Sequence, residues 1–286
     1  MNRLGHLILT LGLATGVSSA PAAGGAEAPR IAVAGGAVTE IVYALGQGDQ
    51  VVGADISSLW PPEVEQRPRI GYLRTLSAEG ILGLHPGLLI TTTEAGPPAT
   101  LEHLRASQVR IETVPTGFTP ESVETKLSRV AQALGLPERG QRLIDQFRSE
   151  WQRTVVQVEQ YKDRPRVLFV LAHTGGSPMV AGRNTAADAM IQLARGENAG
   201  AGFEGYKPLT AEAAAMARPD VILITDEGVK ELGGIPALWG NAALRLTPAG
   251  ERRQVVSMNS LYLLGFGPRL PEAVRDLAAR LRAPDS

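Results

Sequence analysis

The sequence predicts an α/β fold of two related lobes with mainly parallel sheets, joined by one long helix. Three observations predict this. Residues 71–91 and 205–225 each read Gly-Tyr, a basic residue, Ser/Thr-Ala-Glu, a helical stretch, a proline and a buried strand. In each half of the chain, apolar strands alternate with helical patterns, which favours parallel sheets. One helical pattern between them is far longer than the rest. An internal repeat implies related units, and paired lobes suggest a ligand cleft between them.

The first series predicts a lobe over residues 30–135. Its expected strands are 31–34, 51–54, 88–91 and 109–114, and its expected helices run up to Gly46, from Ser77 to before Pro86, and around 101–106. Gly35 and Gly36 follow the first strand, where glycines can cradle a phosphate at a helix start. They lack a complete Gly-x-Gly-x-x-Gly or Walker pattern, so we favour a tight turn.

The connector is predicted as a helix over 137–162, within a linker of 136–163. Its apolar residues recur every four positions with charged residues between them, at Leu143, Phe147, Trp151 and Val155. A helical connector is stiffer than a Gly/Ser linker. It therefore predicts lobes that move only slightly against each other.

The second series predicts a lobe over 164–286, from a strand at 166–171 to a terminal helix at 271–281. His173 follows that strand and enters a glycine-rich loop that ends at Met179. Strand ends are where open α/β sheets bind ligands, so both residues are candidate ligand contacts. A loop histidine that binds nothing stays an open alternative. The histidines include no closely spaced pair, so no zinc site is predicted.

The N-terminus predicts a cleavable signal peptide over residues 1–22. Asn2 and Arg3 precede an apolar run from Leu7 to Val17, and small residues follow up to Ala22. The run is too short for an ordinary membrane span. The sequence has no cysteine, which excludes disulfides, thiolate metal sites and a cysteine-linked lipid anchor, so we expect a soluble periplasmic protein. The 28 basic and 29 acidic residues nearly cancel, so the protein has no net positive charge that would attract nucleic acid.

Tyr72 and Arg74 are the most specific candidates for chemistry. Tyr72 precedes a predicted helix, and Arg74 lies two residues further on. A tyrosinate is one of the few axial ligands of ferric haem. A phenol with an ordinary pKa of about 10 needs the metal and a nearby cation to ionise at neutral pH. Arg74 could supply that charge by donating to the phenolic oxygen. From spacing alone, a tyrosine that only lines a loop remains the favoured alternative.

Five segments together resemble the periplasmic haem-binding proteins of bacterial haem-uptake ABC transporters. They are GYLRTLSAEG (71–80), EAGPP (94–98), AGRNTAAD (181–188), GYKPL (205–209) and GFGPR (265–269). The resemblance covers essentially the whole mature chain. It implies two α/β lobes bridged by one long helix, and haem (ferric protoporphyrin IX) carried in the cleft as the transported ligand. It also implies delivery to an inner-membrane permease driven by its ATPase.

Carried over by position, the resemblance implies Tyr72 as the axial iron ligand and Arg74 as its basic neighbour. His173 falls where some members place a second ligand for stacked haems. That match is looser, so one haem is favoured over two. Tyr206 and Lys207 would face the cleft from the second lobe and contact the porphyrin or a propionate.

Glu79 and Glu212 match the lobe-tip glutamates that in related binding proteins dock onto permease arginines. Acidic residues also simply suit helix N-termini. An outer-membrane haem receptor system is a further candidate partner. Two rival interpretations stay open. One is the same architecture binding a siderophore or cobalamin, which needs no axial tyrosine. The other is an exported haem-processing or hydrolytic enzyme, for which the sequence holds no nucleophile motif. We therefore expect a carrier and not an enzyme.

Overall fold

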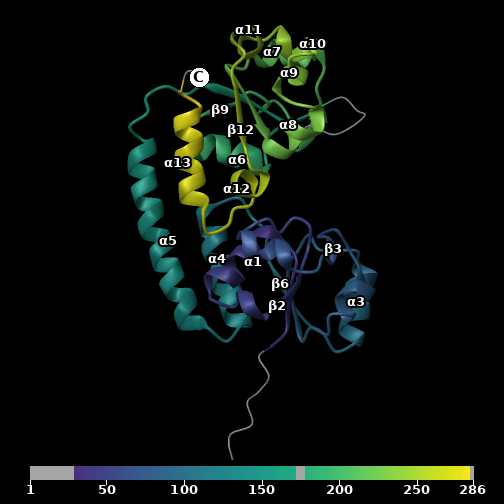
Figure 1. Ribbon diagram of the computed structural model, residues 1–286. Coiled ribbons are helices and arrows are strands. Elements are labelled where there is room, and N and C mark those ends of the chain that lie inside the picture. The colour runs from purple at the N-terminus through teal and green to yellow at the C-terminus, as the bar shows by residue number, and fades with distance from the viewer. Residues whose placement is uncertain (1–28, 172–177, 284–286) are drawn as a thin grey trace, which may run out of the picture.

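The computed structural model describes residues 29–171 and 178–283, so the predicted signal peptide and His173 lie outside the described residues. The N-terminal lobe is built on a parallel sheet of order β2-β1-β5-β6 (Figure 1). Its strands are β1 (Ile31–Val33), β2 (Val51–Ala54), β5 (Leu88–Thr92) and β6 (Arg110–Val114). Strands β1 and β5 are buried along their whole length, because helices cover both faces of a parallel sheet.

The remaining elements of this lobe surround the sheet. A two-stranded hairpin, β3 (Gly71–Tyr72) and β4 (Thr75–Leu76), stands apart from it. The helices are α1 (Gly36–Ala44), α2 (Ala78–Leu82), α3 (Pro98–Ala106) and α4 (Pro120–Ala133), with 3₁₀ turns η1 (Gly48–Gln50) and η2 (Pro62–Gln66). Ser77 caps α2 as predicted, because its hydroxyl accepts the Gly80 N–H at 3.0 Å.

The C-terminal lobe has a mixed sheet of order β10-β8-β7-β11-β12, with β9 paired to β7. Its strands are β7 (Arg166–Leu171), β8 (Met179–Ala181), β9 (Glu197–Asn198), β10 (Tyr206–Pro208), β11 (Val221–Thr225) and β12 (Val255–Met258). Strands β7, β9, β11 and β12 are parallel, whereas β8 runs antiparallel to both of its neighbours, β7 and β10. The predicted fold class is confirmed, with this antiparallel edge as an addition.

Eight helices of the described chain complete this lobe. They are α6 (Ala186–Leu193), α7 (Ala211–Ala217), α8 (Asp226–Leu232), α9 (Ile235–Leu238), α10 (Ala242–Arg245), α11 (Pro248–Arg252), α12 (Ser260–Leu264) and α13 (Leu270–Arg280). Within residues 29–171 and 178–283, no helix is both long and apolar enough to cross a bilayer.

The long helix α5 (Pro137–Val158) lies along one side of the molecule and packs against α4 and α13 (Figure 1). The predicted four-residue stripe is only partly right. Phe147 is buried, but Leu143, Trp151 and Val155 are only partly buried, and the buried face instead includes Ile144, Thr154 and Val158. A step of four residues advances 400°, so a strict four-residue stripe drifts about 40° per step around the helix.

The two lobes share one apolar core. Phe147 of α5, Val33 of β1 and Leu277 of α13 belong to the same cluster of buried side chains. Because interiors are close-packed, shifting one lobe against the other would open voids in this cluster. The shared core is a physical reason to expect small interlobe motion, which itself stays a prediction.

A buried ion pair also crosses between the lobes. Arg269, just before α13, donates to both carboxylate oxygens of Glu40 on α1, at 2.7 and 3.0 Å. Glu40 is only 5% exposed, and burial raises its pKa while the Arg269 hydrogen bond and charge lower it in part. The guanidinium carbon lies over the rings of Trp60 and Tyr262, 4.4 and 5.0 Å from their centroids. We call these four residues the interlobe brace.

A buried lysine forms a second contact between the lobes. Lys126 of α4 is 3% exposed, and its ammonium donates to the carbonyl of Phe266 at 2.9 Å. Burial lowers the pKa of Lys126 to about 8. The ring of Phe266 lies 5.5 Å from that of Phe118.

Removing the arginine of the brace is expected to destabilise the protein strongly. Arg269→Ala leaves the Glu40 carboxylate buried without its partner, which should lower the free energy of unfolding by about 3–5 kcal/mol. The exposed Arg129–Glu112 pair supplies the control, since Arg129→Ala should cost about 0–1 kcal/mol. Urea unfolding measures both variants, and equal midpoints would contradict the role of the brace.

The buried lysine predicts a pH dependence of stability. The folded pKa of about 8 lies below the ordinary 10.5, so between these values the unfolded chain binds more protons than the folded one. Stability should therefore rise with pH across this window, by on the order of 3 kcal/mol. Lys126→Met should lack this rise. Chemical unfolding at pH 7 to 11 measures the difference, and identical slopes would show that Lys126 carries no such penalty.

Candidate functional site

The carboxyl ends of the two sheets meet at the lobe junction. Strand β1 leads into α1, whose first residue is Gly36. Gly36 lies so close to Leu261 of α12 that an added Cβ would collide with the leucine side chain, so the two lobes are in contact here. Helix α12 itself follows the carboxyl end of β12. Open α/β sheets bind ligands at the carboxyl ends of their strands. The candidate site is therefore the face of each lobe that borders this junction.

Tyr72 stands on a hairpin that is fastened to this edge of the N-terminal sheet. Gly71 has a φ of 100°, a left-handed conformation that suits glycine. The Leu76 N–H donates to the Gly96 carbonyl at 2.8 Å, and the Gly96 N–H donates to the Leu73 carbonyl at 3.0 Å. Gly96 lies in the loop that follows β5. Tyr72 is 41% exposed, on a hairpin whose backbone these bonds hold in place.

Arg74 is hydrogen-bonded to the carboxylate of Glu94, whose role the sequence pattern did not predict. Its guanidinium donates to Glu94 at 2.6 Å, and no hydrogen bond joins it to Tyr72. The hydrogen bond and charge of Glu94 raise the pKa of Arg74, and Tyr72 adds a smaller contribution. In this structure Arg74 donates to Glu94 instead, and its hydrogen bond to an iron-bound phenolic oxygen stays a prediction. Arg74 lies within the electrostatic reach of Tyr72 but is held by Glu94.

The C-terminal lobe places the remaining candidates on its antiparallel edge. Tyr206 pairs with Ala181 across β10 and β8, and Met179, partly buried, lies at the start of β8. Tyr206 is 40% exposed; burial raises its pKa, and a hydrogen bond with Thr185 opposes the rise. The phenol of Tyr206 is therefore biased toward its neutral form.

Lys207 does not share a face with Tyr206. Consecutive strand residues point to opposite sides, so the two side chains diverge. The Lys207 ammonium lies over the Phe203 ring, 5.2 Å from its centroid. The strand therefore presents only one of the two side chains to a given side, and the expectation that both contact one ligand stays a prediction.

The two copies of the sequence repeat share several backbone features. Three pairs of residues correspond between the copies. Gly71 corresponds to Gly205, and the helix-capping residue Ser77 corresponds to Thr210. The residue before the proline is His85 in one copy and Arg218 in the other. Each glycine and each pre-proline residue has a positive φ. Glu79 and Glu212 are both exposed in the first helical turn after the cap. The two glutamates thus occupy equivalent positions, one per lobe.

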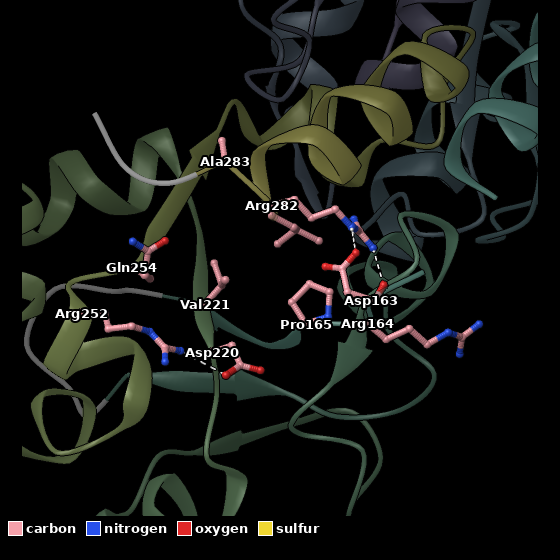
Figure 2. A pocket seen from close by; sticks show the side chains of 10 residues that line it. Asp163, Arg164, Pro165, Asp220, Val221, Arg252, Gln254, Arg282 and Ala283 are labelled. Carbon is pink, nitrogen blue, oxygen red and sulfur yellow. Dashed lines mark hydrogen bonds and ion pairs between the residues drawn. The ribbon is translucent and has the colours of Figure 1, made fainter. Parts of the chain in front are cut away.

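An open pocket of about 520 Å³ lies elsewhere, at the amino ends of β7, β11 and β12 (Figure 2). Two of its arginines are already paired, Arg252 with Asp220 and Arg282 with Asp163, each at 3.1 Å (Figure 2). It contains none of the predicted ligand residues. Over residues 29–171 and 178–283, no group of three His, Asp or Glu side chains gathers as a metal site.

Solved structures of similar proteins share this architecture. The periplasmic heme-binding protein BhuT, in complex with two hemes, is 45% identical, with 88% of this chain and 97% of that chain covered and a TM-score of 0.85. The apo form of RhuT from Roseiflexus sp. RS-1, also a periplasmic heme-binding protein, is 42% identical, with 89% and 98% covered and a TM-score of 0.87.

A more distant curated relative is named for a different ligand. The vitamin B12-binding protein of Vibrio parahaemolyticus is 26% identical over 238 residues, which cover 82% of this chain and 83% of the relative. A family model described as periplasmic binding protein matches residues 31–262. The chain therefore belongs to the periplasmic binding protein family.

Proposed function

We propose that this chain is a non-catalytic carrier that binds ferric haem between its lobes and delivers it to an inner-membrane ABC permease and its ATPase. The observation that carries the proposal is the identity of 42–45% with periplasmic haem-binding proteins over nearly nine-tenths of the chain. The vitamin B12-binding relative is more distant, at 26%. Haem is therefore preferred over cobalamin as the ligand.

Tyr72 is the proposed axial ligand of the iron. Its hairpin is fixed by two backbone hydrogen bonds to the loop after β5, and its side chain is exposed. Arg74 lies two residues further along the same hairpin. Tyr206 lacks these features, since burial raises its pKa. We propose that Tyr206, with Met179, lines the opposite wall, and that Lys207 reaches a propionate at the rim.

A second stoichiometry has a specific observation in its favour. BhuT has been solved with two hemes. We keep one haem as the proposal, with His173 as the second ligand if two haems stack. Variants of His173 distinguish the two cases, as described below.

The proposed carrier works in the periplasm after removal of residues 1–22. Glu79 and Glu212 are the proposed docking points for the permease, because each is exposed in an equivalent first turn of its lobe. An outer-membrane haem receptor system remains a candidate source of the haem.

Removing the phenolic oxygen of Tyr72 tests the ligand assignment. Tyr72→Phe keeps the ring but removes the donor atom, so hemin binding should weaken by at least about tenfold and the ferric tyrosinate spectrum should disappear. Tyr206→Phe is the matched control and should keep that spectrum. Absorption titration with hemin measures both variants.

The same titration separates the alternatives. A tyrosinate spectrum that survives Tyr72→Phe unchanged would contradict the assignment. Loss of one of two bound haems in His173→Ala would support the stacked arrangement. Wild-type protein that takes up cyanocobalamin and no hemin would replace haem by cobalamin as the ligand.

The docking glutamates predict a loss of transport without a loss of binding. Glu79→Ala and Glu212→Ala should leave hemin affinity unchanged but slow hemin uptake by proteoliposomes that contain the cognate permease and ATPase. The defect should diminish at high salt, where charge steering is already weak. Glu138→Ala is the matched control, since Glu138 is also exposed in the first turn of a helix. Equal uptake by all three variants would contradict the docking role.

A further inference from the structure

We propose that Trp60 is a specificity-determining residue of the carrier, a fixed flat wall on which the ring of the ligand stacks. This inference rests on the proposed function. It deepens that function, because it names the property of the ligand that the apolar part of the site selects, which is a planar ring with an open face.

Trp60 lies on the loop between β2 and η2, at the same edge of the N-terminal sheet as the β3–β4 hairpin. The loop and the hairpin are joined directly, because the Ile56 N–H donates to the Gly71 carbonyl at 2.9 Å. Tyr72, the proposed iron ligand, is the next residue of the hairpin. The loop that carries Trp60 therefore borders the segment that carries the iron ligand.

A buried carboxylate holds this loop in place. Asp55 is 0% exposed, and its carboxylate accepts the Gly35 N–H at 2.9 Å and the Ser57 N–H at 3.0 Å. The Ser58 hydroxyl donates to the same carboxylate at 2.6 Å. Buried polar groups that are fully paired keep one backbone arrangement. The start of the loop is thus set by the fold before a ligand arrives.

The C-terminal lobe orients the indole ring. The guanidinium carbon of Arg269 lies 4.4 Å from the ring centroid, and Arg269 is itself held by two hydrogen bonds to Glu40. A cation over one face fixes the direction in which an aromatic ring points. Trp60 nevertheless stays 42% exposed. The ring is therefore held from one side and uncovered over a large part of its surface.

Two further exposed apolar side chains border the junction. Ile56 is 53% exposed beside the hairpin. Phe118 is 37% exposed, and its ring lies 5.5 Å from that of Phe266 in the C-terminal lobe. Exposed apolar surface that gathers in one region marks a binding site, because covering it with a ligand is favourable. The junction therefore offers an apolar face, with Trp60 as its largest ring.

The shape of the ligand decides whether such a face can be covered. A porphyrin is a flat conjugated ring, and flat rings stack offset on aromatic side chains. A corrinoid carries amide side chains that project from both faces of its ring, and these keep a flat wall at a distance. A fixed indole therefore favours a porphyrin over a cobalamin, the two ligand classes for which the relatives are named.

The test uses metal-free protoporphyrin IX beside hemin, because a porphyrin without iron cannot bind through Tyr72. Trp60→Leu keeps an apolar side chain but loses the flat ring, so it should weaken the binding of both porphyrins by a similar factor, about three- to tenfold. Trp60→Phe should restore most of the affinity. Tyr72→Phe should weaken the binding of hemin alone. Fluorescence and absorption titrations measure these affinities.

Tyr262→Leu is the matched control. It removes the other ring over the Arg269 guanidinium, at 5.0 Å, and the Tyr262 hydroxyl is tied to Asp276 of α13 at 3.0 Å. This variant disturbs the interlobe brace as Trp60→Leu does, but it should leave both porphyrin affinities within about twofold of wild type.

Three results would overturn the inference while the proposed function stands. They are unchanged porphyrin affinities in Trp60→Leu, an equal loss in Tyr262→Leu, and wild-type protein that binds hemin but no protoporphyrin IX. Wild-type protein that takes up no hemin would overturn the proposed function as well, so the two failures are distinguishable.

Discussion

The apolar core that passes through α5 into both lobes is the constraint on which the candidate site depends. It keeps the carboxyl ends of the two sheets facing one junction, and the interlobe brace closes that junction with a buried, bidentate ion pair. Burying a charge is costly unless it is paired, so Glu40 and Arg269 disfavour any arrangement that separates them. The relative position of the two lobes is therefore set before a ligand binds between them.

The two copies of the repeat share backbone features but differ in the surroundings of their tyrosines. Gly71 and Gly205 share a left-handed conformation, and a tyrosine follows each. Tyr72 has a cation nearby, held by a carboxylate, whereas Tyr206 lies on an edge strand where burial raises its pKa. In the proposed carrier, this repeated segment holds the iron ligand in one lobe and a wall residue in the other. Glu79 and Glu212, by contrast, occupy the same position in the two first helical turns, which suits the docking role proposed for both.

Local features of this fold could be predicted from sequence, and pairings over long distances could not. The strand at Leu88 and the cap at Ser77 follow from short-range patterns, which neighbouring residues determine. The partners of Arg74 and Arg269 lie 20 and 229 residues away, so only the packed structure brings them together. The stripe on α5 was misplaced because the partners on α4 and α13 select the buried face.

A crystal structure of the hemin-loaded protein tests the central claim most directly. The account predicts an iron atom bonded to the phenolic oxygen of Tyr72, with haem between the lobes. It also predicts that the bond between Arg269 and Glu40 is retained, because the lobes do not separate to admit the ligand. Iron bound by another side chain, or haem bound with the interlobe brace broken, would contradict the account.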